Sequence, residues 1–243
     1  MLREIRPCEK IQATLTLPGS KSYTHRALVA AALAAGESVL INVLKAEDTE
    51  LTAQALTRLG ARVDWQGTTI RVRGARGRWA PVSEPIYLGN SGTSMRFLTA
   101  LVALGQGEYL LTGTDRLCQR PIAELLMALA QLGVKAVSEK GDGCPPVKVH
   151  GGLTGGRARL SGAVSSQYLS ALLFIAPLAP QGAEIEVTGN LVSRPYVDLT
   201  LEVLADFGIS YYREGYRYFQ LPGDQSYLPQ DYEIEADASS ASY

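Results

Sequence analysis

The stretch of sequence richest in reactive side chains reads LPGSKSYTHRA from residue 17 to residue 27, directly ahead of the apolar run LVAAALAAG. A glycine turn that opens a helix leaves backbone N–H groups unpaired, and such groups bind anions. Lys21 and Arg26 add positive charge there. Arg26 falls inside a segment that we expect to be buried, where a guanidinium needs an anionic ligand or a carboxylate. The stretch therefore predicts an oxyanion-binding site.

The same pattern of glycine, small hydroxylated residues and an apolar helix begins at residues 19, 89 and 162. The period is about 73 residues, which indicates three copies of one unit. A single Ser or Asn at a helix start is ordinarily a cap, so one such turn alone is weak evidence for a ligand. Lys21 and Arg26 follow the first of the three turns, and Arg96 follows the second at the same distance as Arg26. These basic groups favour a common anionic ligand.

Two more arginines precede prolines that suit the first turn of a helix, Arg120 in QRPIAELL and Arg194 in SRPYVDLTL. A guanidinium can bind a phosphate or carboxylate through two parallel hydrogen bonds. A solvent-exposed charge near a helix cap is an equally good interpretation of Arg120. Spacing alone leaves both roles open.

A second amphipathic helix recurs in phase and closes at Gly60, Gly133 and Gly208, each followed by segments that suit a hairpin. Each unit thus predicts the order βαβαββ, and the fold class is mixed α/β (α+β). The first helix of every unit is Ala-rich and nearly uncharged, which is typical of burial on all sides. We expect these helices at the centre and the three sheets outside, with the glycine turns meeting at one end.

Composition narrows the class of protein. The 243 residues carry 23 Lys and Arg against 24 Asp and Glu, for a net charge of −1, so no overall charge attracts nucleic acid or an anionic membrane. Cys8, Cys118 and Cys144 show no metal-ligand spacing, and neither do His25 and His150, so we expect reduced thiols, no metal and no cofactor. The first residues resemble neither a secretory signal nor a transit peptide, and no apolar run is long enough to span a bilayer. These features predict a cytoplasmic protein.

Six stretches, in order, resemble the 5-enolpyruvylshikimate-3-phosphate synthases, which belong to the enolpyruvyl transferases. They lie between about residue 11 and the last residue, and they are LPGSKSYTHRALVAAALA, LGNSGTSMRFL, QRPIAELL, SGAVSSQYLSALL, LVSRPYVDLTL and EADASSASY. The resemblance implies an inside-out α/β barrel of three βαβαββ units. It also implies transfer of the carboxyvinyl group of phosphoenolpyruvate to the 5-hydroxyl of shikimate 3-phosphate, by addition and elimination, in aromatic amino acid biosynthesis.

The resemblance also implies roles for individual residues. It assigns a catalytic role to Lys21. It assigns shikimate 3-phosphate to Lys21, Ser22, Arg26, Ser165, Ser166, Gln167, Ser193 and Tyr196. It assigns phosphoenolpyruvate, and the herbicide glyphosate, to Lys21, Asn90, Gly92, Arg120 and Gln167. Thr93 and Arg96 match positions that support the loop. Phe97 stands where the family usually has Pro, so glyphosate sensitivity does not follow from the resemblance.

In this family the acidic groups for proton transfer, and further basic groups, come from a second domain. The resemblance therefore implies a partial enzyme, with residues 20–232 forming a three-repeat substrate-binding domain. It assigns residues 1–19 and 233–243 to hinge strands and pieces of the second domain. We expect a monomer that binds substrate but is inactive alone, unless the missing domain acts in trans.

Two other functions compete with this one. The transferase that acts on UDP-N-acetylglucosamine has Asn at the position of Ser22 and a loop Cys several residues ahead of the Arg-Pro pair, whereas Cys118 precedes Arg120 by two positions. That spacing favours an ordinary buried thiol. The second alternative is a noncatalytic ligand-binding or folding module.

Overall fold

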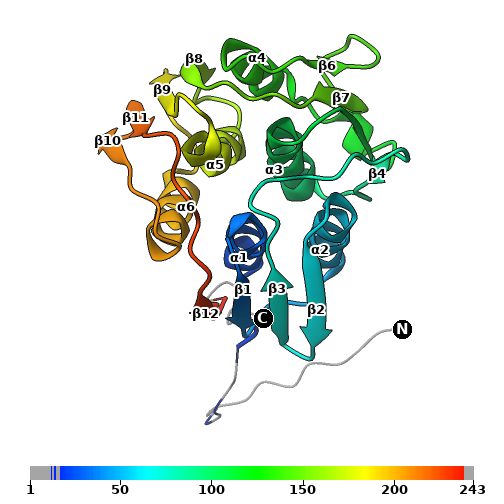
Figure 1. Cartoon of the computed structure of the whole chain (residues 1–243), viewed down its shortest axis with the longest axis vertical. Helices are drawn as coiled ribbons and strands as arrows, with labels where there is room; N and C mark the ends of the chain where they lie inside the picture. Colours follow the sequence, from blue (N-terminus) through cyan, green and yellow to red (C-terminus); the bar gives the residue numbers. More distant parts are fainter. Residues whose placement is uncertain (1–11, 13, 15–16, 238–243) are drawn as a thin grey trace.

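Three four-stranded sheets surround a bundle of six helices in the part of the chain that the structure, a computed structural model, describes: residues 12, 14 and 17–237 (Figure 1). The sheets lie at the periphery. The first helix of each repeat lies at the centre, as predicted, and the second helix lies farther out, between neighbouring sheets. None of the helices within these residues is long and apolar enough to cross a membrane.

The first repeat contains α1 (Lys21–Leu33), β1 (Glu37–Ile41), α2 (Glu47–Leu59), β2 (Arg62–Gln66) and β3 (Thr69–Arg73). Its sheet has the order β12-β1-β3-β2. The strand β12 (Asp231–Glu233) comes from the far end of the chain and pairs in parallel with β1. A segment that follows the third repeat thus completes the first sheet.

The other two repeats are built from continuous chain. The second contains β4 (Ile86–Tyr87), α3 (Gly92–Leu101), β5 (Glu108–Thr112), α4 (Ala123–Gln131), β6 (Ala136–Ser138) and β7 (Val147–His150). The third contains β8 (Gly156–Ser161), α5 (Ser166–Ile175), β9 (Ala183–Thr188), α6 (Arg194–Asp206), β10 (Tyr212–Glu214) and β11 (Tyr218–Leu221). In each, the first two strands are parallel and the remaining neighbours antiparallel. The predicted order βαβαββ is confirmed for these two repeats, whereas the first repeat has the order αβαββ and takes its fourth strand from β12.

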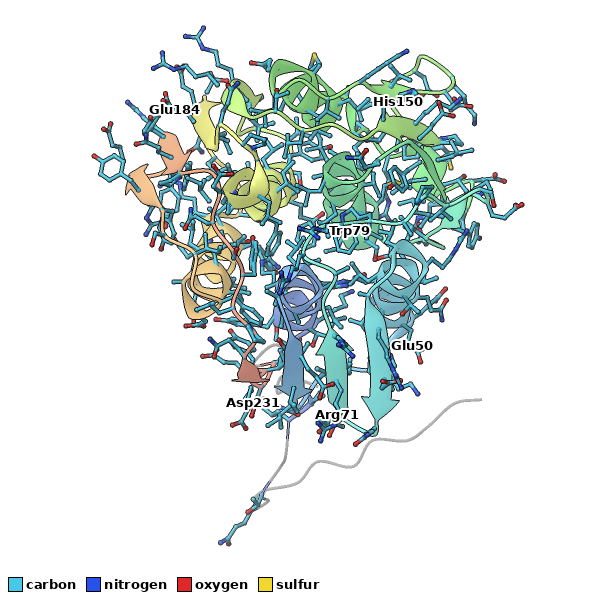
Figure 2. The ribbon with its side chains drawn as sticks, viewed as in Figure 1. Glu50, Arg71, Trp79, His150, Glu184 and Asp231 are labelled. Atoms are coloured by element: carbon cyan, nitrogen blue, oxygen red, sulfur yellow. The ribbon has the colours of Figure 1, made fainter. Side chains whose placement is uncertain are left out.

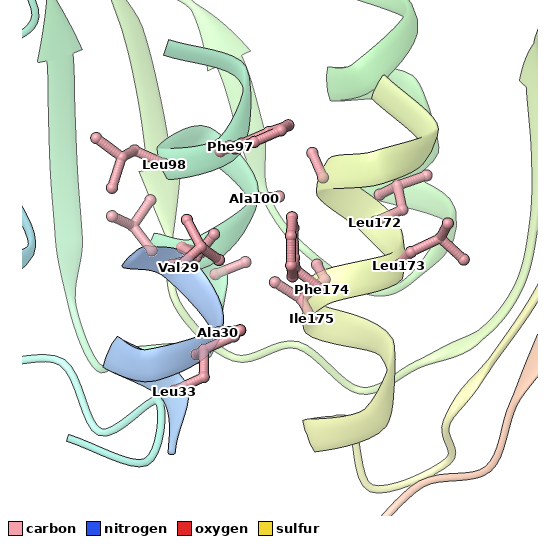
Figure 3. Packing of buried hydrophobic residues seen from close by; sticks show 14 of the residues in the cluster. Val29, Ala30, Leu33, Phe97, Leu98, Ala100, Leu172, Leu173, Phe174 and Ile175 are labelled. Carbon is pink, nitrogen blue, oxygen red and sulfur yellow. The ribbon is translucent and has the colours of Figure 1, made fainter. Parts of the chain in front are cut away.

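The core lies where α1, α3 and α5 meet. Every residue of α1 after Ser22 is buried, and α3 and α5 are buried along most of their length. Figure 3 shows their apolar side chains packed against one another at close range. In Figure 2 the labelled charged residues Glu50, Arg71, Glu184 and Asp231 lie around the outside, as expected when ionised groups stay hydrated.

The predicted ends of the second helices are confirmed at their carboxyl side. Gly60, Gly133 and Gly208 are left-handed, with φ of 116°, 86° and 81°, a conformation that glycine adopts without a steric penalty. We predicted that Pro121 lies in the first turn of α4, and this was wrong. The helix begins at Ala123, two residues after Pro121, because a 3₁₀ turn over Leu117–Gln119 carries the chain to Ile122 first.

Candidate functional site

One cleft collects side chains from the amino ends of four helices that belong to all three repeats. Its volume is about 370 Å³, and it is lined by Lys21, Ser22, Arg26, Thr93, Val164, Ser165, Ser166, Gln167, Val192, Ser193 and Tyr196. The eight residues that the family resemblance assigns to shikimate 3-phosphate are all in this lining. The structure therefore brings together side chains that lie as far as 175 positions apart along the chain, Lys21 and Tyr196.

The helix starts at this cleft present backbone N–H groups together with hydroxyls. Ser165 caps α5, and its Oγ accepts a hydrogen bond from the N–H of Gln167 at 3.2 Å. Ser91 caps α3 in the same way through Ser94. Ser20 precedes α1 and makes no side-chain cap. Unpaired N–H groups at helix starts, with the positive end of each helix dipole, favour a negatively charged ligand.

The ammonium of Lys21 is held at the edge of the cleft by a carboxylate from α2. Its Nζ lies 3.1 Å from Oδ2 of Asp48, and the two side chains are 49% and 30% exposed. A pair this exposed contributes little to stability, because water and salt screen it. The ion pair instead positions the long side chain of Lys21 beside the cleft. Asp48 was not predicted from the sequence.

Arg26 is almost fully buried, and no carboxylate of the described residues pairs with its guanidinium. Of the two expected partners, this leaves the anionic ligand, which stays a prediction. Within the protein, Nε donates to Oγ1 of Thr200 at 2.8 Å, Nη1 to the carbonyl of Ser22 at 2.8 Å, and Nη2 to the carbonyl of Tyr196 at 2.9 Å. Neutral oxygens of α1 and α6 thus satisfy the group, and Arg26 ties the first repeat to the third.

Burial lowers the pKa of Arg26 to about 10, so the side chain remains charged at neutral pH. A guanidinium has five N–H donors, and the three bonds to protein leave one N–H on each Nη. Arg26 also lines the cleft. It can therefore offer two further donors and a full charge to an oxyanion there.

A second group of basic side chains meets at the start of α3. Nη1 of Arg96 donates to Oε1 of Gln167 at 2.9 Å, and Nε2 of Gln167 donates to Oγ1 of Thr93 at 3.0 Å. Arg96 and Arg120 line a narrow crevice with Gly92 between them. A Cβ at residue 92 would lie 2.6 Å from Nη1 of Arg96 and 2.8 Å from Nη1 of Arg120. Only glycine lets both guanidinium groups approach this turn.

Neither Arg96 nor Arg120 forms an ion pair with a residue in the described part of the chain. Nε of Arg96 is buried without a hydrogen-bond partner there. Two unneutralised guanidinium groups in one crevice repel each other, and a bound anion relieves that repulsion. The two guanidinium groups therefore leave unbalanced positive charge next to the main cleft.

Comparison with known proteins identifies the family of this chain. The family model described as EPSP synthase (3-phosphoshikimate 1-carboxyvinyltransferase) matches residues 5–243. The chain belongs to the EPSP synthase family. The 3-phosphoshikimate 1-carboxyvinyltransferases of Buchnera aphidicola subsp. Schizaphis graminum and Pectobacterium atrosepticum are 43% and 44% identical to it, over 99% and 98% of this chain.

A solved structure of EPSP synthase from Acinetobacter baumannii matches 93% of this chain with a TM-score of 0.84 and 27% sequence identity. The match covers 51% of that protein. The chain likewise spans 57% of the length of the two curated relatives. It therefore corresponds to little more than half of a typical member of the EPSP synthase family.

The residues that the EPSP synthase resemblance assigns to phosphoenolpyruvate are spread over the two neighbouring sites. Lys21 and Gln167 line the main cleft, and Gly92 and Arg120 line the crevice. Asn90 is exposed just ahead of α3 and lines neither of them. The bond between Arg96 and Gln167 connects the cleft with the crevice. Arg96 and Thr93 thus hold the side chain of Gln167, and their predicted support of the loop stays a prediction.

Ser193 has a left-handed backbone, with φ of 53°, immediately before α6. For a residue with a Cβ this conformation costs about 1 kcal/mol, and such strain gathers at functional sites. The turn brings both Ser193 and Tyr196 to the cleft. A larger cleft of about 710 Å³ is lined by Arg194, and none of the residues assigned to either substrate lines it.

A chain of buried polar side chains links α1, α2 and α3. Nδ1 of His25 lies 2.9 Å from Oγ1 of Thr52, which lies 2.7 Å from Oγ of Ser94. Ser94 in turn lies 2.6 Å from Oγ of Ser91. Nε2 of His25 is buried without a partner in the described residues. This network, which the sequence did not reveal, fixes α1, α2 and α3 relative to one another.

The buried imidazole predicts a loss of stability in mild acid. Burial lowers the pKa of His25 to about 3, whereas the unfolded chain titrates near its ordinary value of 6.5. As pH falls from 7 to 5, the imidazole of His25 becomes protonated in the unfolded state but stays neutral in the native state. The free energy of unfolding therefore drops by about 2 kcal/mol. His25→Gln, which does not titrate, should lose that much less over the same interval. Urea unfolding at both pH values measures it, and equal losses in the two proteins would contradict the assignment.

The remaining thiols do not add a reactive site. Cys118 and Cys144 are free and partly exposed, so the prediction of a buried thiol at Cys118 was wrong: the residue sits in the exposed 3₁₀ turn ahead of α4. Cys8 lies outside the described residues. The described part of the chain holds no group of three or more His, Cys, Asp or Glu side chains that could bind a metal ion.

Proposed function

We propose that this chain is the shikimate 3-phosphate-binding part of a 3-phosphoshikimate 1-carboxyvinyltransferase. Such an enzyme moves the carboxyvinyl group of phosphoenolpyruvate to the 5-hydroxyl of shikimate 3-phosphate. The observation that carries the proposal is the single cleft lined by all eight residues assigned to shikimate 3-phosphate. Membership in the EPSP synthase family supports it further.

The proposed ligand carries a phosphate and a carboxylate, and the cleft offers donors for both. The hydroxyls of Ser165 and Ser166 lie at the start of α5, where backbone N–H groups and the helix dipole suit a phosphate. Ser22 and Arg26 on α1, with Ser193 and Tyr196 at the start of α6, face the same space. Arg26 brings a fixed positive charge that its protein partners do not neutralise.

We propose that phosphoenolpyruvate, and glyphosate in its place, binds between the cleft and the crevice. Lys21 and Gln167 reach it from the cleft, and Gly92 and Arg120 from the crevice. Asn90 lies on the exposed approach to α3. Two anionic substrates repel each other, and the ammonium and guanidinium groups that converge here offset that repulsion.

The reaction adds a proton to the methylene carbon of phosphoenolpyruvate while the 5-hydroxyl oxygen attacks the adjacent carbon and loses its proton. The tetrahedral intermediate then expels phosphate and loses a methyl proton, which restores the double bond. Each proton transfer needs a positioned acid or base. Lys21, an ammonium at the cleft, is our candidate proton donor. Among the described residues, the lining of the cleft contains no Asp or Glu.

We therefore propose binding without turnover. Residues 20–232 form the substrate-binding domain in this proposal, and residues 1–19 and 233–243 belong to hinge strands and pieces of a second domain. An isolated β-bridge between Gly19 and Ala236 places the two connecting segments side by side, which fits a paired hinge. Residues 1–11, 13, 15–16 and 238–243 lie outside the described part.

Isothermal titration calorimetry with shikimate 3-phosphate tests the proposal. We expect saturable binding, weakened about tenfold or more by Lys21→Ala, since a hydrogen bond to a charged group contributes about 1.5–3 kcal/mol. Lys45→Ala removes an equal charge from an exposed pair with Glu50 outside the cleft and should leave binding unchanged. No saturable heat, or equal losses in both variants, would overturn the binding role. Release of phosphate from phosphoenolpyruvate over many turnovers, with both substrates present, would overturn the expected inactivity.

A further inference from the structure

Arg26 is a buried cation that no carboxylate balances. Among the described residues its guanidinium forms no ion pair, and its three protein bonds go to a hydroxyl and two backbone carbonyls. Carboxylates beside a buried arginine usually compensate for its lost hydration. Here something else must help to hold the charge, because neutral oxygens alone replace only part of that hydration.

Two aromatic rings flank the group. The guanidinium carbon lies 5.5 Å from the ring centroid of Phe97 and 5.8 Å from that of Tyr196. Tyr196 is 46% exposed at the cleft, whereas Phe97 is fully buried on α3. Figure 3 shows Phe97 on α3 and Phe174 on α5 in the packed core. Their rings meet edge to face, with centroids 5.4 Å apart and an angle of 68° between the planes. The ring of Phe97 is thus held rigidly under Arg26.

A ring face and a carboxylate stabilise a cation with different consequences for ligand binding. A carboxylate neutralises the guanidinium and competes with an anionic ligand for its N–H groups. The face of a phenyl ring attracts the cation through its quadrupole, carries no net charge and accepts none of the remaining donors. An arginine held in this way keeps its charge and its two free N–H groups for the ligand.

We propose that Phe97 is the positioning residue for Arg26, holding the guanidinium charged and aimed at the cleft without a competing carboxylate. The inference rests on the proposed function, because it assigns Phe97 an effect on the binding of shikimate 3-phosphate. Phe97 does not line the cleft and acts only through Arg26. Its contribution comes from the second repeat, while the partners that hydrogen-bond Arg26 come from the first and third.

A matched pair of variants separates this role from ordinary packing. Phe97→Leu and Phe174→Leu each remove one ring of the same edge-to-face pair in the same core. Both should lower the midpoint of thermal unfolding to a similar degree. Only Phe97→Leu should weaken shikimate 3-phosphate binding, by about tenfold, because only Phe97 faces the guanidinium. Equal binding losses in the two variants would overturn the proposal.

A double-mutant cycle and a direct probe of the side chain complete the test. In an Arg26→Gln background, Phe97→Leu should change the affinity by less than about twofold, since the residue through which it acts is gone. The Nε–H resonance of Arg26, assigned by its absence in Arg26→Gln, should shift in Phe97→Leu more than in Phe174→Leu. If the wild-type chain does not bind shikimate 3-phosphate at all, the proposed function fails. The resonance still decides whether Phe97 positions Arg26, and an unmoved resonance in Phe97→Leu would overturn that role.

Discussion

Arg26→Leu is expected to weaken the binding of shikimate 3-phosphate more than about hundredfold and to lower the free energy of unfolding by about 3 kcal/mol. The side chain offers the ligand a charge and two free N–H groups, and the variant removes all of them. It also removes one donor from each of three oxygens, those of Ser22, Tyr196 and Thr200, and leaves a gap at a buried position. Calorimetry and urea unfolding measure the two effects separately.

Arg58→Leu is the matched control for that prediction. Arg58 also donates to two backbone carbonyls, those of Pro85 and Glu84, but it does so at the surface and away from the cleft. We expect a stability loss below about 1 kcal/mol and unchanged affinity, because water replaces exposed hydrogen bonds. An Arg26→Leu protein that binds as well as the wild type would remove Arg26 from the site.

Gly74→Ala is expected to destabilise the protein by more than about 4 kcal/mol or to prevent folding. A Cβ at residue 74 would lie 2.3 Å from the carbonyl oxygen of Ala34, 2.5 Å from that of Ala31 and 3.0 Å from that of Ala32. All three oxygens belong to backbone at the end of α1, and the N–H of Ala75 bonds the carbonyl of Ala32 there at 2.9 Å. The helix α1 cannot move away without breaking this hydrogen bond. Urea unfolding should therefore show a much lower midpoint or no cooperative transition.

Gly36→Ala provides the comparison within the same region. Its Cβ would meet only the ring of Pro229, at 3.0 Å, and a side chain can shift where packed backbone cannot. We expect a loss of about 1 kcal/mol. Equal unfolding midpoints for Gly74→Ala and the wild type would show that the end of α1 does not pack against residue 74.

The repeated architecture was predictable because several independent sequence patterns recur with the same period. Helices without charged residues must be buried, glycine closes the second helices, and alternating segments after them form hairpins. The strand β12 was not predictable in the same way. Its partner β1 lies 192 positions away, counted from Val39 to Asp231, and no local pattern announces a pairing over that distance.

The binding residues were predictable as a set, but their partners were not. The glycine turns and hydroxyls mark the helix starts that line the cleft, so Ser165 and Ser166 could be found from sequence. The charge of Arg26 suggested a ligand or a carboxylate, but nothing in the sequence indicated its hydrogen bonds to Thr200 and two carbonyls. Hydrogen bonds to neutral oxygens and contacts with rings leave no mark in residue spacing. Asp48 had a weak signal, because acidic residues gather in the first turn of α2.

The most direct test of the central claim is a map of backbone amide chemical shifts during titration of the chain with shikimate 3-phosphate. If helix starts from separate repeats hold one ligand, amides at residues 20–22, 165–167 and 193–196 will shift together and saturate at the same concentration. Shifts confined to a single helix start, or gathered in the neighbouring cleft around Asn190 and Arg217, would contradict a shared site.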